Sequence, residues 1–128
     1  MSEPGAAKHI LVVDDDEGYR RLVKNMLEAT DFRVTTAGDF TSAMQVIESA
    51  VPLDLLLTDV QLPAKTPHGL AIGLMTKSKR PDLPTIYMTG SYDAEKFAEL
   101  TQGAKVLPKP FTAAQLVGAI NETLAARA

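Results

Sequence analysis

Ile10-Leu11-Val12-Val13-Asp14-Asp15-Asp16 is the stretch that decides the fold, because four apolar residues run directly into three carboxylates. Two further apolar runs also end in a polar side chain, Leu55-Leu56-Leu57-Thr58 before Asp59 and Thr85-Ile86-Tyr87-Met88 before Thr89. A fourth segment, Val106-Leu107-Pro108, precedes Lys109. Short, nearly continuous apolar runs are typical of strands buried on both faces of a parallel sheet. If the four runs are neighbouring strands, their carboxyl ends bring carboxylates, a hydroxyl and an ammonium to one edge.

Segments with helical periodicity separate these runs, and Asp16 is placed to cap the first of them. The apolar residues expected to face the core are Tyr19, Leu22, Val23, Met26 and Leu27 in the first helix; Phe40, Ala43, Met44 and Ile47 in a second that starts at Gly38-Asp39; Leu70, Leu74 and Met75 in a third over about 69–79; Phe97, Ala98 and Leu100 in a fourth over 94–102; and Leu116, Val117, Ile120 and Leu124 in the last.

A further strand is predicted at 32–36, where apolar and polar residues alternate. Five consecutive strand–helix units predict an α/β fold, a three-layer sandwich with one parallel sheet and helices on both faces. The flavodoxin-like strand order 2-1-3-4-5 is favoured, since it places strands one and three side by side at the ligand-binding edge. Pro108 supports this order, because proline cannot donate to a sheet ladder and strand five is then an edge.

The composition limits the possible functions. The 128 residues suit one domain, expected over 8–128, after a flexible tail at 1–7. A net charge of −3 gives no general attraction to nucleic acid or to an anionic membrane. The absence of cysteine excludes disulfides, thiol catalysis and thiolate metal sites. No apolar run approaches the roughly 18 residues of a membrane span, and no secretory signal is visible, so a cytoplasmic protein is expected.

The polar edge suggests a specific chemistry. Clustered carboxylates repel one another unless a cation lies among them. A divalent cation such as Mg²⁺ together with a phosphoryl group would satisfy the whole set, and a carboxylate can accept that group as an acyl phosphate. Other interpretations exist. The aspartate triplet could be only a strand end with a helix cap, and Lys109 could be a solvated loop residue. Asp15 and Asp16, in place of Asp14 and Asp15, could be the functional acidic pair. His9 and His68 are interpreted as surface or structural residues.

At this point the sequence resembles the receiver domain of bacterial two-component response regulators. The resemblance covers about residues 8–127 and is carried by four pieces in order: Ile-Leu-Val-Val-Asp-Asp-Asp at 10–16, Leu-Leu-Leu-Thr-Asp-Val-Gln-Leu-Pro at 55–63, Met-Thr-Gly at 88–90 and Lys-Pro-Phe at 109–111. Each piece alone is weak, but four at successive strand ends are specific.

The resemblance implies a role for each matched residue. Asp59 would be the phosphoacceptor, and Asp14 and Asp15 would hold Mg²⁺ together with Asp59 and the backbone carbonyl of Gln61. Thr89 and Lys109 would contact phosphoryl oxygens, and Gly90 would leave space beside them. The phosphodonor would be a sensor histidine kinase or a histidine phosphotransfer protein. The chain would be a switch and not an enzyme, presenting the face of helix four, strand five and helix five to an output protein.

Two departures from the family pattern bear on signalling. The loop from Asp59 to Gly69 is expected to be about two residues longer than usual. Val106 stands where the family usually has an aromatic residue, whose ring rotates inward when the threonine that corresponds to Thr89 moves.

Two other functions compete with this interpretation. One is a receiver-like binding module that works without phosphorylation. The other is an aspartate-nucleophile phosphatase of the haloacid dehalogenase type, in which the first aspartate of the triplet would be the nucleophile. Gly18 stands where that family expects threonine or valine, and a late acidic pair is missing.

Overall fold

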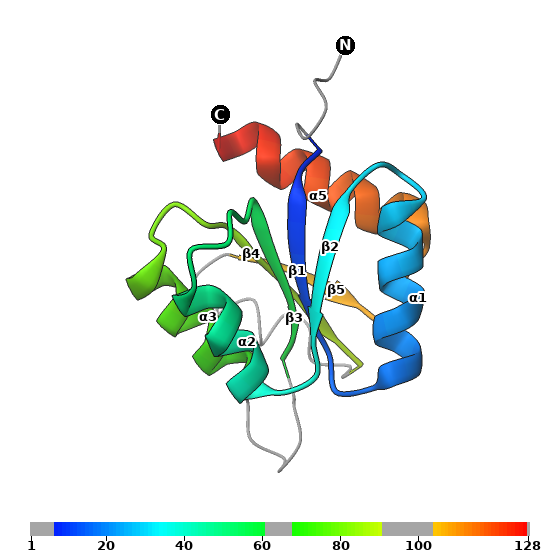
Figure 1. The fold of residues 1–128 in the computed structure, drawn as a ribbon. Helices are drawn as coiled ribbons and strands as arrows, with labels where there is room; N and C mark the ends of the chain where they lie inside the picture. The colour runs from blue at the N-terminus through cyan, green and yellow to red at the C-terminus, as the bar shows by residue number, and fades with distance from the viewer. Residues whose placement is uncertain (1–6, 61–67, 91–103, 128) are drawn as a thin grey trace.

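The computed structural model describes residues 7–60, 68–90 and 104–127 of the chain (Figure 1). They form a five-stranded parallel sheet with the order β2-β1-β3-β4-β5, as predicted. The strands are β1 His9–Val13, β2 Arg33–Ala37, β3 Leu55–Asp59, β4 Thr85–Thr89 and β5 Lys105–Pro108. The helices are α1 Glu17–Glu28, α2 Phe40–Glu48, α3 His68–Lys79 and α5 Ala113–Arg127. The predicted tail, the loop 61–67 and the helix at 94–102 lie wholly or mainly outside the described residues.

The strand register brings the carboxyl ends of β1, β3, β4 and β5 to one edge of the sheet. Val13 pairs with Thr58, Asp59 with Met88, and Thr89 with Pro108. Pro108 lies in β5, at the edge of the sheet, as its missing N–H group predicts. The polar residues that end or follow these strands are therefore neighbours across the sheet.

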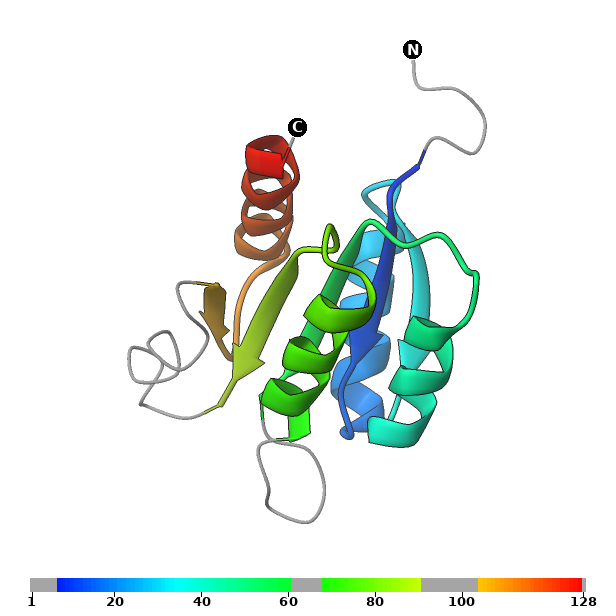
Figure 2. The ribbon, with the colours of Figure 1, turned by 90° about the vertical axis from the view of Figure 1, so that its left-hand side faces the viewer.

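The helices cover both faces of the sheet, and each face has its own apolar core (Figure 2). On one face α1 and α5 pack through Val23, Leu27, Leu116 and Ile120 against strand residues that include Ile10 and Leu57. On the other face α2 and α3 pack through Ala43, Met44, Ile47 and Ile72 against Leu11, Val13 and Leu56. Full burial of such a side chain contributes about 1.5–3 kcal/mol, so these two layers hold the strand ends in place.

Two aspartates cap helices next to the polar edge. Asp16 accepts a hydrogen bond from the backbone N–H of Tyr19 at 3.0 Å, which confirms the cap predicted for α1. Asp39 accepts one from the backbone N–H of Ser42 at 2.7 Å and caps α2 in the same way. These caps fix the first turn of each helix beside the end of a strand.

The predicted inward face of α3 is wrong. Leu74 and Met75 are 61% and 38% exposed, whereas Ile72, Gly73 and Thr76 are buried. At Gly73 the helix lies too close to the sheet for any side chain: a Cβ atom there would lie 1.8 Å from the Tyr87 hydroxyl oxygen. The Thr76 hydroxyl donates to the Ile72 carbonyl at 2.7 Å and so needs no partner in the sheet. The packing face of α3 therefore consists of Ile72, Gly73 and Thr76.

Two smaller findings concern α1 and β1. Leu22 was expected in the core but is 46% exposed, because the buried stripe of α1 is narrower and centres on Val23 and Leu27. His9 is buried, and its ring pairs with the Pro52 carbonyl at 2.8 Å and the Thr35 hydroxyl at 2.7 Å. These contacts agree with the structural role inferred for His9.

Candidate functional site

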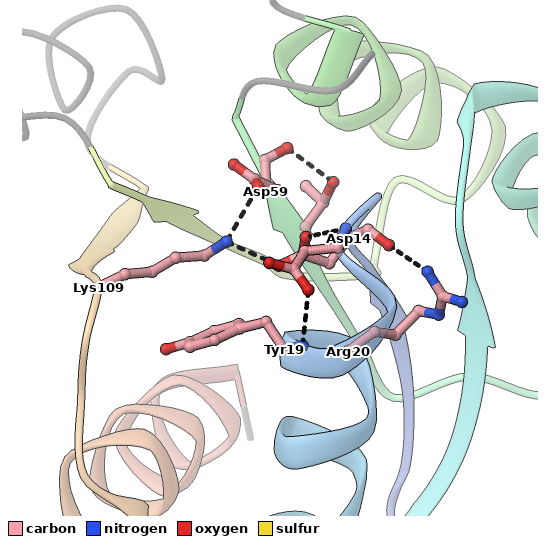
Figure 3. A network of polar contacts seen from close by, with 7 residues as sticks. Asp14, Tyr19, Arg20, Asp59 and Lys109 are labelled. Carbon is pink, nitrogen blue, oxygen red and sulfur yellow. Dashed lines mark hydrogen bonds and ion pairs between the residues drawn. The ribbon is translucent and has the colours of Figure 1, made fainter.

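Three residues predicted for the site, Asp14, Asp59 and Lys109, lie together where the strands end (Figure 3). Asp14 follows β1 and is fully buried, and Asp59 ends β3 with 8% of its surface exposed. Thr89 ends β4 and is buried, and Lys109 follows β5. The backbone N–H of Lys109 donates to the Thr89 carbonyl at 2.7 Å, which continues the β4–β5 pairing up to the site.

The Lys109 ammonium bridges the two buried carboxylates. It donates to Asp14 Oδ2 at 2.7 Å and to Asp59 Oδ2 at 3.0 Å. Burial alone would lower the pKa of Lys109, but the bonds and charges of Asp14 and Asp59 outweigh burial and hold the pKa above its ordinary value. Lys109 is therefore a charged component of the site and not a solvated loop residue.

The position of Asp14 is fixed from three sides. Its backbone N–H donates to the Ala37 carbonyl at 3.2 Å, and its Oδ1 accepts from the Asp16 backbone N–H at 2.9 Å. Arg20 Nη1 donates to the Asp14 carbonyl oxygen at 2.7 Å. One carboxylate oxygen thus orders the turn into α1, and the other faces the centre of the site.

Three carboxylates form a group able to hold a metal ion. One oxygen each from Asp14, Asp15 and Asp59 lies within 4.8 Å of the others. Asp15 is exposed, so the group opens to solvent on its side. Anionic oxygens are the donors that Mg²⁺ prefers, and the ion usually keeps several of its water ligands. Asp16 is engaged in the α1 cap, which fits the pairing of Asp14 with Asp15 better than the alternative pairing of Asp15 with Asp16.

Two glycines shape the surroundings. A Cβ atom at Gly69 would lie 1.7 Å from the Asp59 carbonyl oxygen, so only glycine allows α3 to begin this close to β3. A Cβ atom at Gly90 would meet nothing within 4 Å, in line with the open space expected there. Gln61, the last residue predicted for the site, lies outside the described residues, as does the lengthened loop.

Sequence reasoning missed the roles of Tyr19 and Arg20. Tyr19 was counted only as a core residue, yet its ring centroid lies 4.5 Å from the Lys109 ammonium. Nothing in the sequence indicated a role for Arg20 in the site, because its hydrogen bond to the Asp14 carbonyl depends on how the turn before α1 folds. Both residues lie in the first turn of α1, directly after the aspartates.

Comparisons with known proteins agree with the fold and the acidic group. The family model described as the response regulator receiver domain matches residues 10–121. The response regulator receiver protein CpdR of Brucella abortus is 31% identical over 121 residues, which cover 93% of this chain and 98% of that protein. The response regulator MprA of Mycobacterium ulcerans is 34% identical over 117 residues, and the chain spans about half of its length, 49%.

Solved structures give the same result. The response regulator receiver protein of Sinorhizobium medicae superposes with a TM-score of 0.86 at 26% identity, covering 98% of this chain and 100% of that one. The response regulator TrrA of Thermotoga maritima, solved in complex with Mg²⁺-BeF, has a TM-score of 0.79 at 23% identity, covering 91% and 98%. Among the described helices, none has the length and apolar character needed to cross a membrane.

Proposed function

Because the chain belongs to the response regulator receiver domain family of two-component signalling, we propose that Asp59 accepts a phosphoryl group and that its phosphorylation switches partner binding. The family is one of signalling switches and not of classical enzymes. The observation that carries the proposal is the bridge from Lys109 to Asp14 and Asp59, beside a third carboxylate from Asp15. An ammonium that bonds carboxylate oxygens can also bond the oxygens of a phosphoryl group, because both are anionic acceptors.

Asp59 would act as the nucleophile. One of its carboxylate oxygens attacks phosphorus, the new O–P bond forms as the P–N bond of a phosphohistidine breaks, and the imidazole leaves with the electron pair. The negative charge of the transferred group falls on its equatorial oxygens. Lys109 already donates to Asp59, so its ammonium is within reach of one of these oxygens. Thr89, buried at the end of the neighbouring strand, is proposed to bond another, and Gly90 leaves space for the donor.

Asp14, Asp15 and Asp59, with the backbone carbonyl of Gln61, are proposed to hold Mg²⁺. The ion would neutralise charge on the carboxylates and on the phosphoryl oxygens. The three clustered oxygens support this assignment, as does the Mg²⁺-BeF complex of TrrA, a protein of the same fold. Lys109 would then give up its bond to Asp14 and keep its place beside Asp59.

The proposed donor is a sensor histidine kinase or a histidine phosphotransfer protein, the usual partners of receiver domains. The proposed output surface is the one that includes β5 and α5, together with the segment between β4 and β5. A groove of about 460 Å³ between β5 and α5 supports this choice, with Val106, Pro108, Phe111 and Gly118 among its lining residues. Lys105 and Glu122 form an ion pair of 2.6 Å across that groove.

The proposal is tested by incubating the chain with acetyl phosphate and measuring its intact mass. We expect one added phosphoryl group that requires Mg²⁺ and is absent in Asp59→Asn. Asp54→Asn is a matched control, because Asp54 bonds the His9 backbone N–H far from the site and should leave phosphorylation unchanged. Equal labelling of wild type and Asp59→Asn would contradict the proposal. Unchanged partner binding in Asp59→Asn, and no effect of beryllofluoride, would favour the phosphorylation-independent module.

A further inference from the structure

Tyr19 places the face of its ring against the Lys109 ammonium. The ammonium lies 4.5 Å from the ring centroid, within the range of a cation–π interaction (Figure 3). Two contacts hold Tyr19 in place, one to its backbone and one to its ring. The Asp16 cap binds the Tyr19 backbone N–H at 3.0 Å, and the ring of Phe111 packs edge-on at a centroid distance of 5.6 Å and an interplanar angle of 81°.

The phenol hydroxyl of Tyr19 contributes nothing comparable. Its oxygen is buried and pairs with no charged or polar side chain of the described residues; burial raises the pKa of the phenol more than the nearby Phe111 backbone lowers it. Burial raises the pKa of the Tyr19 phenol above its ordinary value, so the group stays neutral and forms no ion pair with Lys109. The ring face is therefore the part of Tyr19 that acts on the ammonium.

The other contacts of the ammonium depend on the state of the site. Lys109 bonds one carboxylate oxygen of Asp14 and one of Asp59, and a metal ion or phosphoryl group that took up these oxygens would compete with it. The negative face of an aromatic ring keeps its attraction for a cation whatever the carboxylates do. An ammonium that loses Asp14 would otherwise be free to swing into solvent on its long stem.

We propose that Tyr19 is a positioning residue for Lys109, whose ring holds the ammonium at the phosphoryl site when the carboxylates are engaged elsewhere. The proposal rests on the phosphoryl-contacting role of Lys109 proposed above. Removing the attraction between ring and ammonium should weaken the binding of a phosphoryl analogue about tenfold.

The first test compares Tyr19→Phe with Tyr19→Leu in the full chain. Two quantities are measured. Binding of beryllofluoride with Mg²⁺ gives the affinity for a phosphoryl analogue. NMR of the ε-methylene protons of Lys109, recorded without any ligand, reports how close these protons lie to the ring. We expect ring-current shielding of these protons in wild type and Tyr19→Phe, and its loss in Tyr19→Leu. Beryllofluoride affinity should fall about tenfold only in Tyr19→Leu, in proportion to the lost cation–π attraction. Shielding that persists in Tyr19→Leu would overturn the proposal.

A double-mutant cycle separates positioning from a structural effect. In a Lys109→Met background, Tyr19→Leu should cause no further loss of beryllofluoride affinity. The same tenfold loss in that background would mean that Tyr19 acts through the fold and would overturn the proposal.

A second series keeps the shape of the ring. Phenylalanine with increasing numbers of fluorine atoms at position 19 weakens the negative ring face stepwise. Affinity should fall along the series, and constant affinity would overturn the proposal. If wild type binds no beryllofluoride while the Lys109 shielding still depends on the ring, the positioning of Lys109 stands and the proposed function fails.

Discussion

Lys109 is the residue on which the charge balance of the site depends. Its side chain is only 17% exposed, and it bonds two carboxylates whose side chains are 0% and 11% exposed. Breaking such a pair leaves an uncompensated buried charge, whereas exposed pairs contribute little. The same ammonium competes with any cation that binds these carboxylates.

We therefore expect Lys109→Met to lower the free energy of unfolding by about 2–4 kcal/mol without metal. Mg²⁺ should restore much of this loss and bind more tightly than in wild type, since its competitor is gone. Urea titration with and without Mg²⁺ measures both effects. Lys105→Met is the control, because the exposed pair with Glu122 should contribute less than about 1 kcal/mol. Equal losses in both variants, or no response to Mg²⁺, would contradict this account.

Asp15 and Asp16 are adjacent in sequence but differ in what they contact. Asp15 belongs to the carboxylate group, and Asp16 caps α1. Asp15→Asn should weaken Mg²⁺ binding about tenfold or more, since one charge is lost from the site. Asp16→Asn should leave Mg²⁺ binding and stability nearly unchanged, because asparagine caps helices as well as aspartate does. Calorimetric titration with Mg²⁺ measures both variants, and a similar loss of Mg²⁺ binding in Asp15→Asn and Asp16→Asn would favour Asp15 and Asp16 as the metal pair.

At the scale of elements, α3 is attached to the sheet by the contact of Tyr87 with Gly73. A new methyl group at Gly73 would collide with the buried phenol of Tyr87. Gly73→Ala should therefore destabilise the fold by about 1–3 kcal/mol, although alanine favours helix. Gly118→Ala in α5 meets nothing within 4 Å and should stabilise by about 0.5–1 kcal/mol. Thermal unfolding measures both, and Tyr87→Phe should rescue Gly73→Ala only in part, because the ring carbon Cζ of residue 87 would still lie 2.7 Å from the new Cβ atom. Stabilisation by both alanines would refute the tight contact.

This contact also explains where sequence reasoning failed. The strands and the polar residues at their ends follow from local patterns, because apolar runs and their polar ends are contiguous. The strand order was instead inferred from the usual topology of five-stranded parallel sheets and from Pro108. The inward face of α3 does not follow from local patterns. It depends on the close contact between Gly73 and Tyr87, a residue of β4. Hydrophobicity pointed instead to Leu74 and Met75, which are exposed. The ring of Tyr19 was hidden for a similar reason, because its partner Lys109 is distant in sequence.

For the molecule as a whole, three groups predict sensitivity to alkaline pH: Tyr87, Lys109 and Tyr19, whose pKa is also raised by burial. Burial raises the pKa of Tyr87, and the pKa of Lys109 is also raised, since Asp14 and Asp59 outweigh its burial. The folded chain thus holds these protons at a pH where the unfolded chain has begun to lose them, above about pH 10. The associated stability is fully present below that pH and is lost as pH rises through the folded pKa values.

Urea unfolding between about pH 8 and pH 11 should accordingly show a falling free energy of unfolding at the alkaline end. Tyr87→Phe removes one of the three groups and should make the fall shallower. A free energy that stays constant or rises above about pH 10 would be inconsistent with these assignments.

The central claim is that Asp59 is the carboxylate that becomes phosphorylated. The most direct measurement is reaction with acetyl phosphate and Mg²⁺, trapping of the acyl phosphate with borohydride, and peptide mapping by mass spectrometry. The account predicts a single modified residue, Asp59, in wild type and none when Mg²⁺ is withheld. Modification of Asp14 with continued turnover of the substrate would contradict it and would indicate a phosphatase with its nucleophile in the first strand.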